Sequence, residues 1–146
     1  MRIFANQGNG QFTPGSVVQF QFPVSYTNGT LQPFVADFNG DGKLDFVIAR
    51  DGYASAPGEG LEFFLGDGNL GWSNRVLLPL NSPNWIAIGN MDADPAMEVA
   101  VLHAAPAYDR HLAWVDFQAG VPIELPPLVF ASGGTTTAGK FGLAPS

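Results

Sequence analysis

The sequence contains no cysteine, and its 146 residues include only six Lys and Arg against 13 Asp and Glu. The absence of cysteine excludes disulfides, thiolate metal sites and cysteine nucleophiles. No apolar run approaches the length of a membrane-spanning helix, and the first six residues lack the hydrophobic segment of a signal peptide. We therefore expect no membrane insertion, and the chain shows no signal peptide.

Uninterrupted helical segments are also missing. Eighteen Gly and 12 Pro are spread along the chain and leave no window for a long helix. Short β-branched and aromatic runs recur between turn signals, a pattern that predicts an all-β fold. With 46% hydrophobic residues and 12 Phe, a chain of this length can form one domain with a substantial core.

Basic residues form no continuous face. The six Lys and Arg are scattered and the net charge is −7, so we do not expect nucleic acid as a partner. The acidic residues are more concentrated than the basic ones. Six of them occupy two short segments: Asp37, Asp41, Asp45, Asp92, Asp94 and Glu98.

The first of these segments carries oxygen-bearing side chains at every second position and then enters an apolar strand. Ca²⁺ takes about six to eight oxygen ligands, and a tight Gly-containing loop of alternating carboxylates with one inward carbonyl supplies them. We predict a calcium site formed by the side chains of Asp37, Asn39, Asp41 and Asp45 and the backbone carbonyl of Lys43. The alternative is a β-turn whose carboxylates are only solvated. An EF-hand is excluded because an isoleucine occupies its twelfth position, which requires a bidentate Glu.

The calcium loop has a second copy at an offset of 53 residues, in which Asn90, Asp92, Asp94 and Glu98 align with the four side-chain ligands. Pro95 replaces a Gly of the first copy, and Pro cannot adopt a positive φ. The pattern therefore predicts a weaker or empty metal site. A third copy overlays residues 138–145 on 88–95 at an offset of 50 and has lost the ligands. Residues 2–12 also match residues 62–72 at an offset of 60, as a strand, a turn and an aromatic residue.

A repeating unit of about 50 to 60 residues with about four short strands is typical of a β-propeller blade. We predict blades of four antiparallel strands in a single partial propeller of about two and a half blades: a partial blade at 1–30, blades at 31–80 and 81–131, and the start of another at 132–146. Strands are expected near 33–37, 45–50, 61–65 and 72–79, then near 84–89, 97–103, 111–117 and 121–130. The remaining blades are expected from a longer chain or from identical copies.

These residues resemble the FG-GAP/VCBS repeat family, whose blades build integrin-α-like β-propellers. The resemblance is strongest from Val35 to Ala49, followed by the hairpin at 61–69. It implies that the first loop binds calcium through the five residues named above. It also implies a non-catalytic binding or adhesion module at the cell surface or outside the cell.

Other motifs are better explained by structure than by chemistry. Residues 66–71 satisfy GxGxxG, but a strand pattern follows where a phosphate site needs a helix, so no nucleotide cofactor is expected. His103 and His111 are interpreted as capped or solvent-facing residues rather than as a catalytic dyad. Trp72, Trp85 and Trp114 could offer stacking platforms to sugars, but their strand positions predict core packing.

Three functions remain open from the sequence. The first is a non-catalytic, calcium-stiffened module that binds a protein or glycan. The second is a propeller appendage of a larger secreted enzyme. The third is a structural segment in which calcium contributes only stability. Fold analogy does not choose among them, because propellers host many functions.

Overall fold

The protein is an all-β chain. A computed structural model describes residues 2–18, 32–50, 58–72, 74–104, 110–126 and 128–130. Every regular element in these ranges is a β-strand, and the strands form three antiparallel sheets. The predicted fold class is therefore confirmed. The described ranges hold no helix long and apolar enough to cross a membrane.

The first two sheets are a hairpin and a four-stranded sheet. The hairpin pairs β1 (Arg2–Asn6) with β2 (Phe12–Val17). The middle sheet has the order β3-β4-β5-β6, with bounds β3 (Phe34–Ala36), β4 (Asp45–Arg50), β5 (Gly60–Leu65) and β6 (Asn74–Pro79). Neighbours in sequence are neighbours in the sheet, as the predicted blade requires.

The third sheet, which we call the second sheet because it is the second of the two large ones, repeats this order. It contains β7 (Trp85–Gly89), β8 (Glu98–Ala104), β9 (Arg110–Gln118), β10 (Val121–Glu124) and β11 (Leu128–Phe130). Both β10 and β11 pair with β9, so the outer strand predicted at 121–130 is split into two. The other predicted strands agree with the observed ones to within about two residues.

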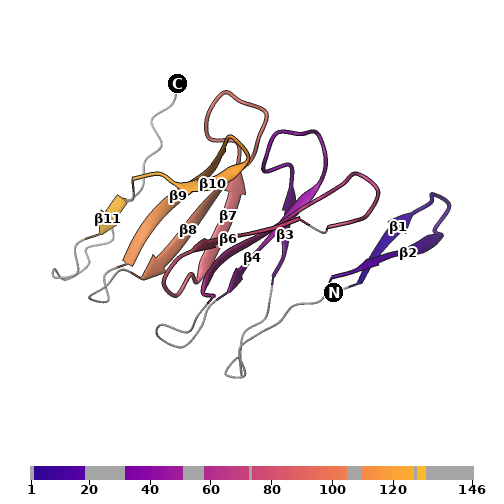
Figure 1. Cartoon of the computed structure of the whole chain (residues 1–146), viewed down its shortest axis with the longest axis horizontal. Helices are drawn as coiled ribbons and strands as arrows, with labels where there is room; N and C mark the ends of the chain where they lie inside the picture. The colour runs from indigo at the N-terminus through magenta and orange to yellow at the C-terminus, as the bar shows by residue number, and fades with distance from the viewer. Residues whose placement is uncertain are drawn as a thin grey trace.

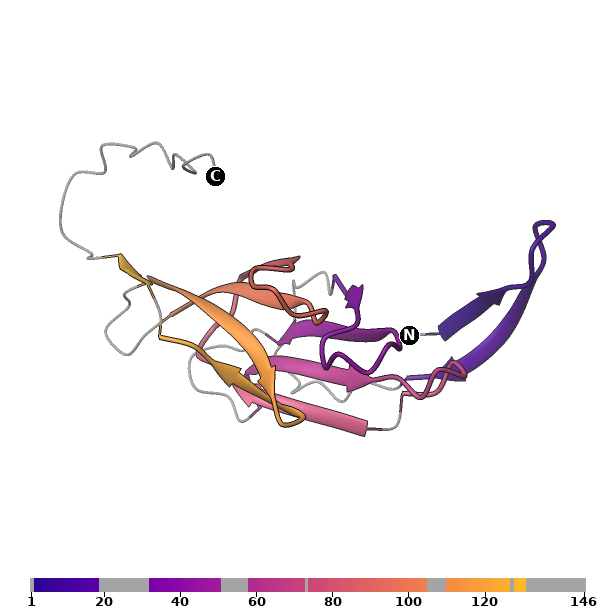
Figure 2. The ribbon, with the colours of Figure 1, turned by 90° about the horizontal axis from the view of Figure 1, so that it is seen from above.

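The hairpin, the middle sheet and the second sheet follow one another in chain order along the long axis of the molecule (Figure 1). The view from above shows the same order (Figure 2). Alternate residues of β4 and β5, among them Val47, Leu61 and Phe63, pack against Val101 and Val115 of the second sheet. Phe63 is fully buried and contacts Phe117 edge to face, with ring centroids 5.0 Å apart.

The other face of the middle sheet is buried as well. Phe46, Ile48 and Phe64 form a second cluster with Val18, and Ile3 of the hairpin and Trp72 pack against it. Because both faces are covered, β4 and β5 are apolar almost throughout instead of alternating. This stacking of antiparallel four-stranded units is consistent with propeller-like blades.

The hairpin repeat at an offset of 60 residues is visible in the hydrogen bonds. The Gln7 amide donates to the Gln11 carbonyl at 2.8 Å, and the Asp67 amide donates to the Gly71 carbonyl at 3.0 Å. Gly68 has a φ of 82°, which a residue with a side chain adopts only with strain. The chain leaves this turn into β6, so the GxGxxG pattern lies in a hairpin and not at the start of a helix.

The packing predicted for one tryptophan is wrong. Trp72 contacts the second cluster, but Trp85 is 74% exposed. Its neighbour Ile86 contacts the middle sheet, so Trp85 projects from the opposite face of the second sheet, beside Leu102 in the strand register. None of the described residues covers that face at Trp85. The third loop copy and the further blade expected at 132–146 lie outside the described residues.

Candidate metal centre

The first loop, residues 37–45, connects β3 to β4 and wraps its own amides around its acidic side chains. Asp37 accepts from the Asp41 amide at 3.1 Å and from the Gly42 amide at 2.7 Å. The Asn39 side-chain oxygen also accepts from the Asp41 amide, at 3.0 Å. Gly40 and Gly42 have φ values of 72° and 81°, so the turn uses the left-handed region that glycine reaches without strain.

Asp41 is held by the residue two positions further on. Its Oδ1 accepts from the Lys43 amide at 2.9 Å, and its Oδ2 lies 3.1 Å from the Lys43 ammonium. Desolvation acts to raise the pKa of Asp41, but the bonds from the Lys43 amide and ammonium outweigh it. The pKa of Asp41 is therefore lowered from its ordinary value, and the side chain is charged at neutral pH.

Asp45, the last predicted ligand, is buried, with 1% of its surface exposed. Its Oδ2 accepts from the Phe38 amide at 3.1 Å, and its Oδ1 accepts from the Gly66 amide at 2.7 Å. Desolvation raises the pKa of Asp45, the two amides act in the opposite direction, and the charges of Asp41 and Asp37 add to the rise. Asp45 thus fastens the loop to the end of β5.

The second loop, residues 90–98, repeats three of these hydrogen bonds at the offset of 53 residues. The Asp94 amide donates to Asp92 at 2.8 Å, as the Asp41 amide donates to Asn39. The Ala96 amide donates to Asp94 at 2.8 Å, as the Lys43 amide donates to Asp41. The third is the bond from the Met91 amide to Glu98, which matches the bond from the Phe38 amide to Asp45.

Two substitutions in the second loop compensate for each other. Pro95 has no amide hydrogen, so the loop lacks the donor that Gly42 offers to Asp37 in the first copy. Asn90 has an amide nitrogen where Asp37 has a second oxygen, and this nitrogen donates to the Asp94 carbonyl. The loop therefore closes by a different bond, without the positive φ that Gly42 supplies.

Glu98 leaves one oxygen atom without a partner. The residue is 3% exposed, and its Oε1 is buried and accepts no hydrogen bond, whereas the equivalent oxygen of Asp45 accepts from Gly66. Ligand oxygens of Asp92, Asp94 and Glu98 all lie within 4.8 Å of one another. Three carboxylates at this spacing form a hard-oxygen donor set that suits Ca²⁺.

The stronger calcium binding expected at the first loop stays a prediction, as does the weaker binding expected at the second. Among the residues that the structure describes, Asp92, Asp94 and Glu98 are the one group of three acidic or imidazole side chains within 4.8 Å. The five residues predicted in the first loop all lie in one turn, and its carboxylates accept from backbone amides as those of the second loop do, with Lys43 as an added partner. In the second loop, the longer side chain of Glu98 brings its carboxylate near those of Asp92 and Asp94 from a buried backbone position.

The two loops touch across the boundary between the sheets. The Met97 amide of the second loop donates to the Asp37 carbonyl of the first at 2.9 Å. A Cβ atom at Gly40 would lie 3.8 Å from the Cβ of Ala96. A change in the conformation of one loop would therefore displace atoms that contact the other loop.

Comparison with known proteins assigns part of this architecture. Residues 1–48 match the family model of the FG-GAP-like repeat. The match covers the hairpin, β3, the first loop and the start of β4, and it confirms the predicted resemblance over these residues. Repeats of this family are typically extracellular and non-catalytic. No curated protein and no solved structure matches the chain significantly.

The second loop lies beyond the part that matches the FG-GAP-like repeat, and its likeness to the first loop rests on the three repeated hydrogen bonds. His103 differs from its predicted surroundings. It is 6% exposed rather than solvent-facing, and its Nε2 lies 3.1 Å from Glu124. Its ring meets the His111 ring edge to face, with centroids 5.6 Å apart.

We predict that Asp45→Ala destabilises the chain even when EDTA removes all divalent metal. The substitution leaves two buried amides without an acceptor, at about 1–3 kcal/mol each. Urea unfolding should therefore show a loss of about 2–6 kcal/mol. Asp41→Ala is the matched control, because Asp41 is exposed and its loss in EDTA should stay near 0.5 kcal/mol. Equal losses in the two variants would contradict the anchoring role of Asp45.

Proposed function

We propose that the chain is a calcium-binding, non-catalytic propeller module that binds a protein or glycan ligand. Two observations carry the calcium assignment: the carboxylates of Asp92, Asp94 and Glu98 cluster within 4.8 Å, and Oε1 of the buried Glu98 has no hydrogen-bond partner. A buried carboxylate oxygen without a partner is costly, and a divalent cation removes that cost. The FG-GAP-like repeat at 1–48 supports the propeller part of the proposal.

Both loops are proposed as Ca²⁺ sites. In the first, the ligands are the side chains of Asp37, Asn39, Asp41 and Asp45 and the carbonyl of Lys43. In the second, they are the side chains of Asn90, Asp92, Asp94 and Glu98. If the module works outside the cell, we expect it to bind Ca²⁺ with dissociation constants of about 10⁻⁴–10⁻³ M, the range of extracellular calcium modules.

Calcium would stiffen the boundary between the sheets. Each ion offsets the mutual repulsion of carboxylates within one loop. The hydrogen bond from Met97 to Asp37 then joins two loops that are each held rigid. A rigid rim of loops is a suitable surface for binding a partner, because little conformational entropy is lost when the partner docks.

We expect Ca²⁺ to raise the melting temperature. An ion that binds only the native state stabilises it by about 2.7 kcal/mol at 100 times its dissociation constant. For a chain of this size that corresponds to a rise of roughly 5–10 °C. Calorimetry in Ca²⁺ and in EDTA measures the rise, and a calcium titration gives the number of sites.

Two variants test whether the rise in melting temperature comes from ions bound in the two loops. Glu98→Gln keeps an acceptor for the Met91 amide and removes the charge, and Asp41→Asn does the same for the Lys43 amide. Each should lose one binding step. Asp67→Asn, an exposed change in the hairpin turn, should keep the full rise. If EDTA leaves the wild-type melting curve unchanged, or if both loop variants keep the full rise, the metal assignment is wrong.

The binding proposal is tested on glycan and protein arrays with and without calcium. We expect saturable binding that EDTA abolishes, because chelation softens the loops. The bound glycans should be recovered intact, since the module is proposed to be non-catalytic. Binding that is identical in EDTA would separate ligand recognition from calcium, and cleavage that is lost on substituting a residue of this chain would overturn the non-catalytic assignment.

We also propose that further blades, from a longer chain or from identical copies, cover the exposed face of the second sheet. Trp85 on this face is 74% exposed, and Leu102 and Leu112 stand beside it in register. Light scattering on the purified chain should show self-association that Trp85→Ser reduces. Leu44→Ser, at a loop residue that is 62% exposed, is the control and should change nothing. A stable monomer of 15.5 kDa with a sharp unfolding transition would contradict this proposal.

A further inference from the structure

Asp116 lies beside the second metal loop, on the strand that follows it in the sheet. β8 and β9 pair in antiparallel register, with Val99 opposite Val115. One step further along this register, Glu98 of β8 stands opposite Asp116 of β9. The two valines pack against the middle sheet, so strand alternation turns Glu98 and Asp116 together to the opposite face. Side chains that face each other in this way have Cβ atoms about 4.5–5.5 Å apart.

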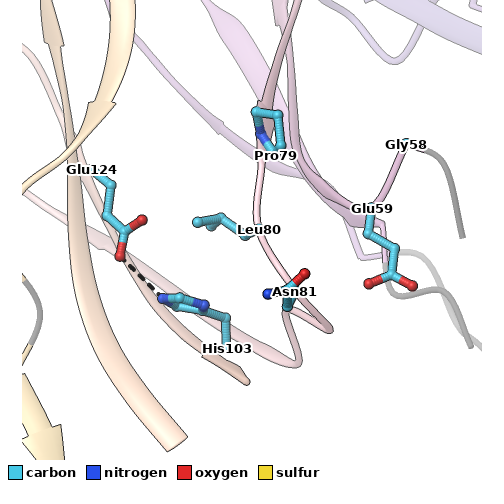
Figure 3. A pocket seen from close by; sticks show the side chains of 7 residues that line it. All are labelled: Gly58, Glu59, Pro79, Leu80, Asn81, His103 and Glu124. Carbon is cyan, nitrogen blue, oxygen red and sulfur yellow. Dashed lines mark hydrogen bonds and ion pairs between the residues drawn. The ribbon is translucent and has the colours of Figure 1, made fainter. Parts of the chain in front are cut away.

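Each of these two carboxylates has a buried oxygen without a hydrogen-bond partner. The atoms are Oε1 of Glu98 and Oδ1 of Asp116, and no other carboxylate oxygen in the described part of the chain is in this state. Glu124 of β10 shows a satisfied arrangement. It stands opposite Val115, and its carboxylate lies 3.1 Å from Nε2 of His103 (Figure 3). Buried oxygens that meet neither a donor nor water are costly, and a cation bound to both would remove the cost.

No basic residue in the neighbouring sequence offsets the charge at this end of the sheet. Residues 84–104 and 111–126 contain no Lys or Arg. Arg110 begins β9 at its far end, opposite Ala104. The first loop differs, because Lys43 pairs with Asp41 at 3.1 Å. The acidic residues in the two basic-free ranges are Asp92, Asp94, Glu98, Asp116 and Glu124.

The middle sheet has a leucine where the second sheet has Asp116. Asp45 corresponds to Glu98 at the offset of 53 residues, and the pairing of β4 with β5, continued by one step, places Leu65 opposite Asp45. Asp45 needs no ligand from β5, because both of its oxygens accept from backbone amides. In the second sheet, the free oxygen of Glu98 and the carboxylate opposite it occur together. The two differences between the sheets therefore have one explanation if both carboxylates bind the same ion.

We propose that Asp116 is a further ligand of the second metal centre, where it joins the three acidic residues of the loop. This inference rests on the proposed Ca²⁺ site in that loop. The three loop acids alone lie within 4.8 Å of one another, so Asp116 reaches the ion by a rotation of its half-buried side chain. Ca²⁺ takes about six to eight oxygen ligands, and Asp116 supplies a carboxylate where the loop has Asn90 in place of an aspartate.

The test compares Asp116→Leu and Asp116→Asn with the unsubstituted residue by calcium calorimetry. The titrations use the Asp41→Asn background, in which we expect only the second loop to bind. Asp116→Leu installs the residue that the middle sheet has at this position, and Asp116→Asn keeps the shape of the side chain. Both should weaken calcium binding at least about tenfold, because the affinity of a calcium site follows the number of charged ligands.

Thermal unfolding in EDTA separates a ligand from a residue that only supports the fold. Without metal, both Asp116 variants should melt at or above the temperature of the parent chain, because a buried oxygen without a partner has lost its charge. A purely structural residue would lower this temperature and leave the calcium affinity unchanged. Asp67→Asn is the matched control, since it removes the same charge from an exposed turn and should leave calcium binding at the second loop unchanged.

Three results would overturn the proposal. Unchanged calcium affinity in both Asp116 variants, with binding lost in Glu98→Gln, would overturn it and leave the proposed function intact. Equal weakening in Asp67→Asn would also overturn it, since the effect would then be one of net charge. No binding at the second loop of the parent chain would overturn the proposed calcium site as well. If neither Asp116 variant folds, the carboxyl ¹³C NMR signal of Asp116 in the wild-type chain decides: it should shift when calcium binds, and a stationary signal contradicts the proposal.

Discussion

The arrangement of the two candidate metal loops depends on the packing of the middle sheet against the second sheet. Phe63 is fully buried between Phe38 and Phe117, with ring centroids 5.6 and 5.0 Å away in edge-to-face contacts. Fully burying one such side chain contributes about 1.5–3 kcal/mol. Because this core fixes the two sheets, the Met97 amide of the second loop reaches the Asp37 carbonyl of the first loop.

The two loops keep the same three hydrogen bonds although several of their residues differ. The three repeated hydrogen bonds tie each loop to its own acidic side chains, and they survive the change from Gly42 to Pro95 because Asn90 supplies a new closing bond. The difference that matters for an ion is at the last position. Asp45 uses both oxygens on buried amides, whereas Glu98 keeps one oxygen free of any hydrogen bond.

Much of the fold could be predicted from the sequence, because strand alternation, turn residues and the repeat offsets are local signals. The all-β class and nearly all strand positions follow from them. Two features could not be predicted in this way. The exposure of Trp85 depends on whether another sheet covers its face, and the contact of His103 with Glu124 joins strands that are not sequence neighbours.

The most direct test of the account is a crystal structure grown in calcium, with the ions located by anomalous scattering. The account predicts a peak in each loop, and in the second loop a peak within about 2.3–2.6 Å of oxygens from Asp92, Asp94 and Glu98, including the oxygen that now has no partner. Density without a peak in either loop, at calcium concentrations well above those of extracellular fluid, would contradict it.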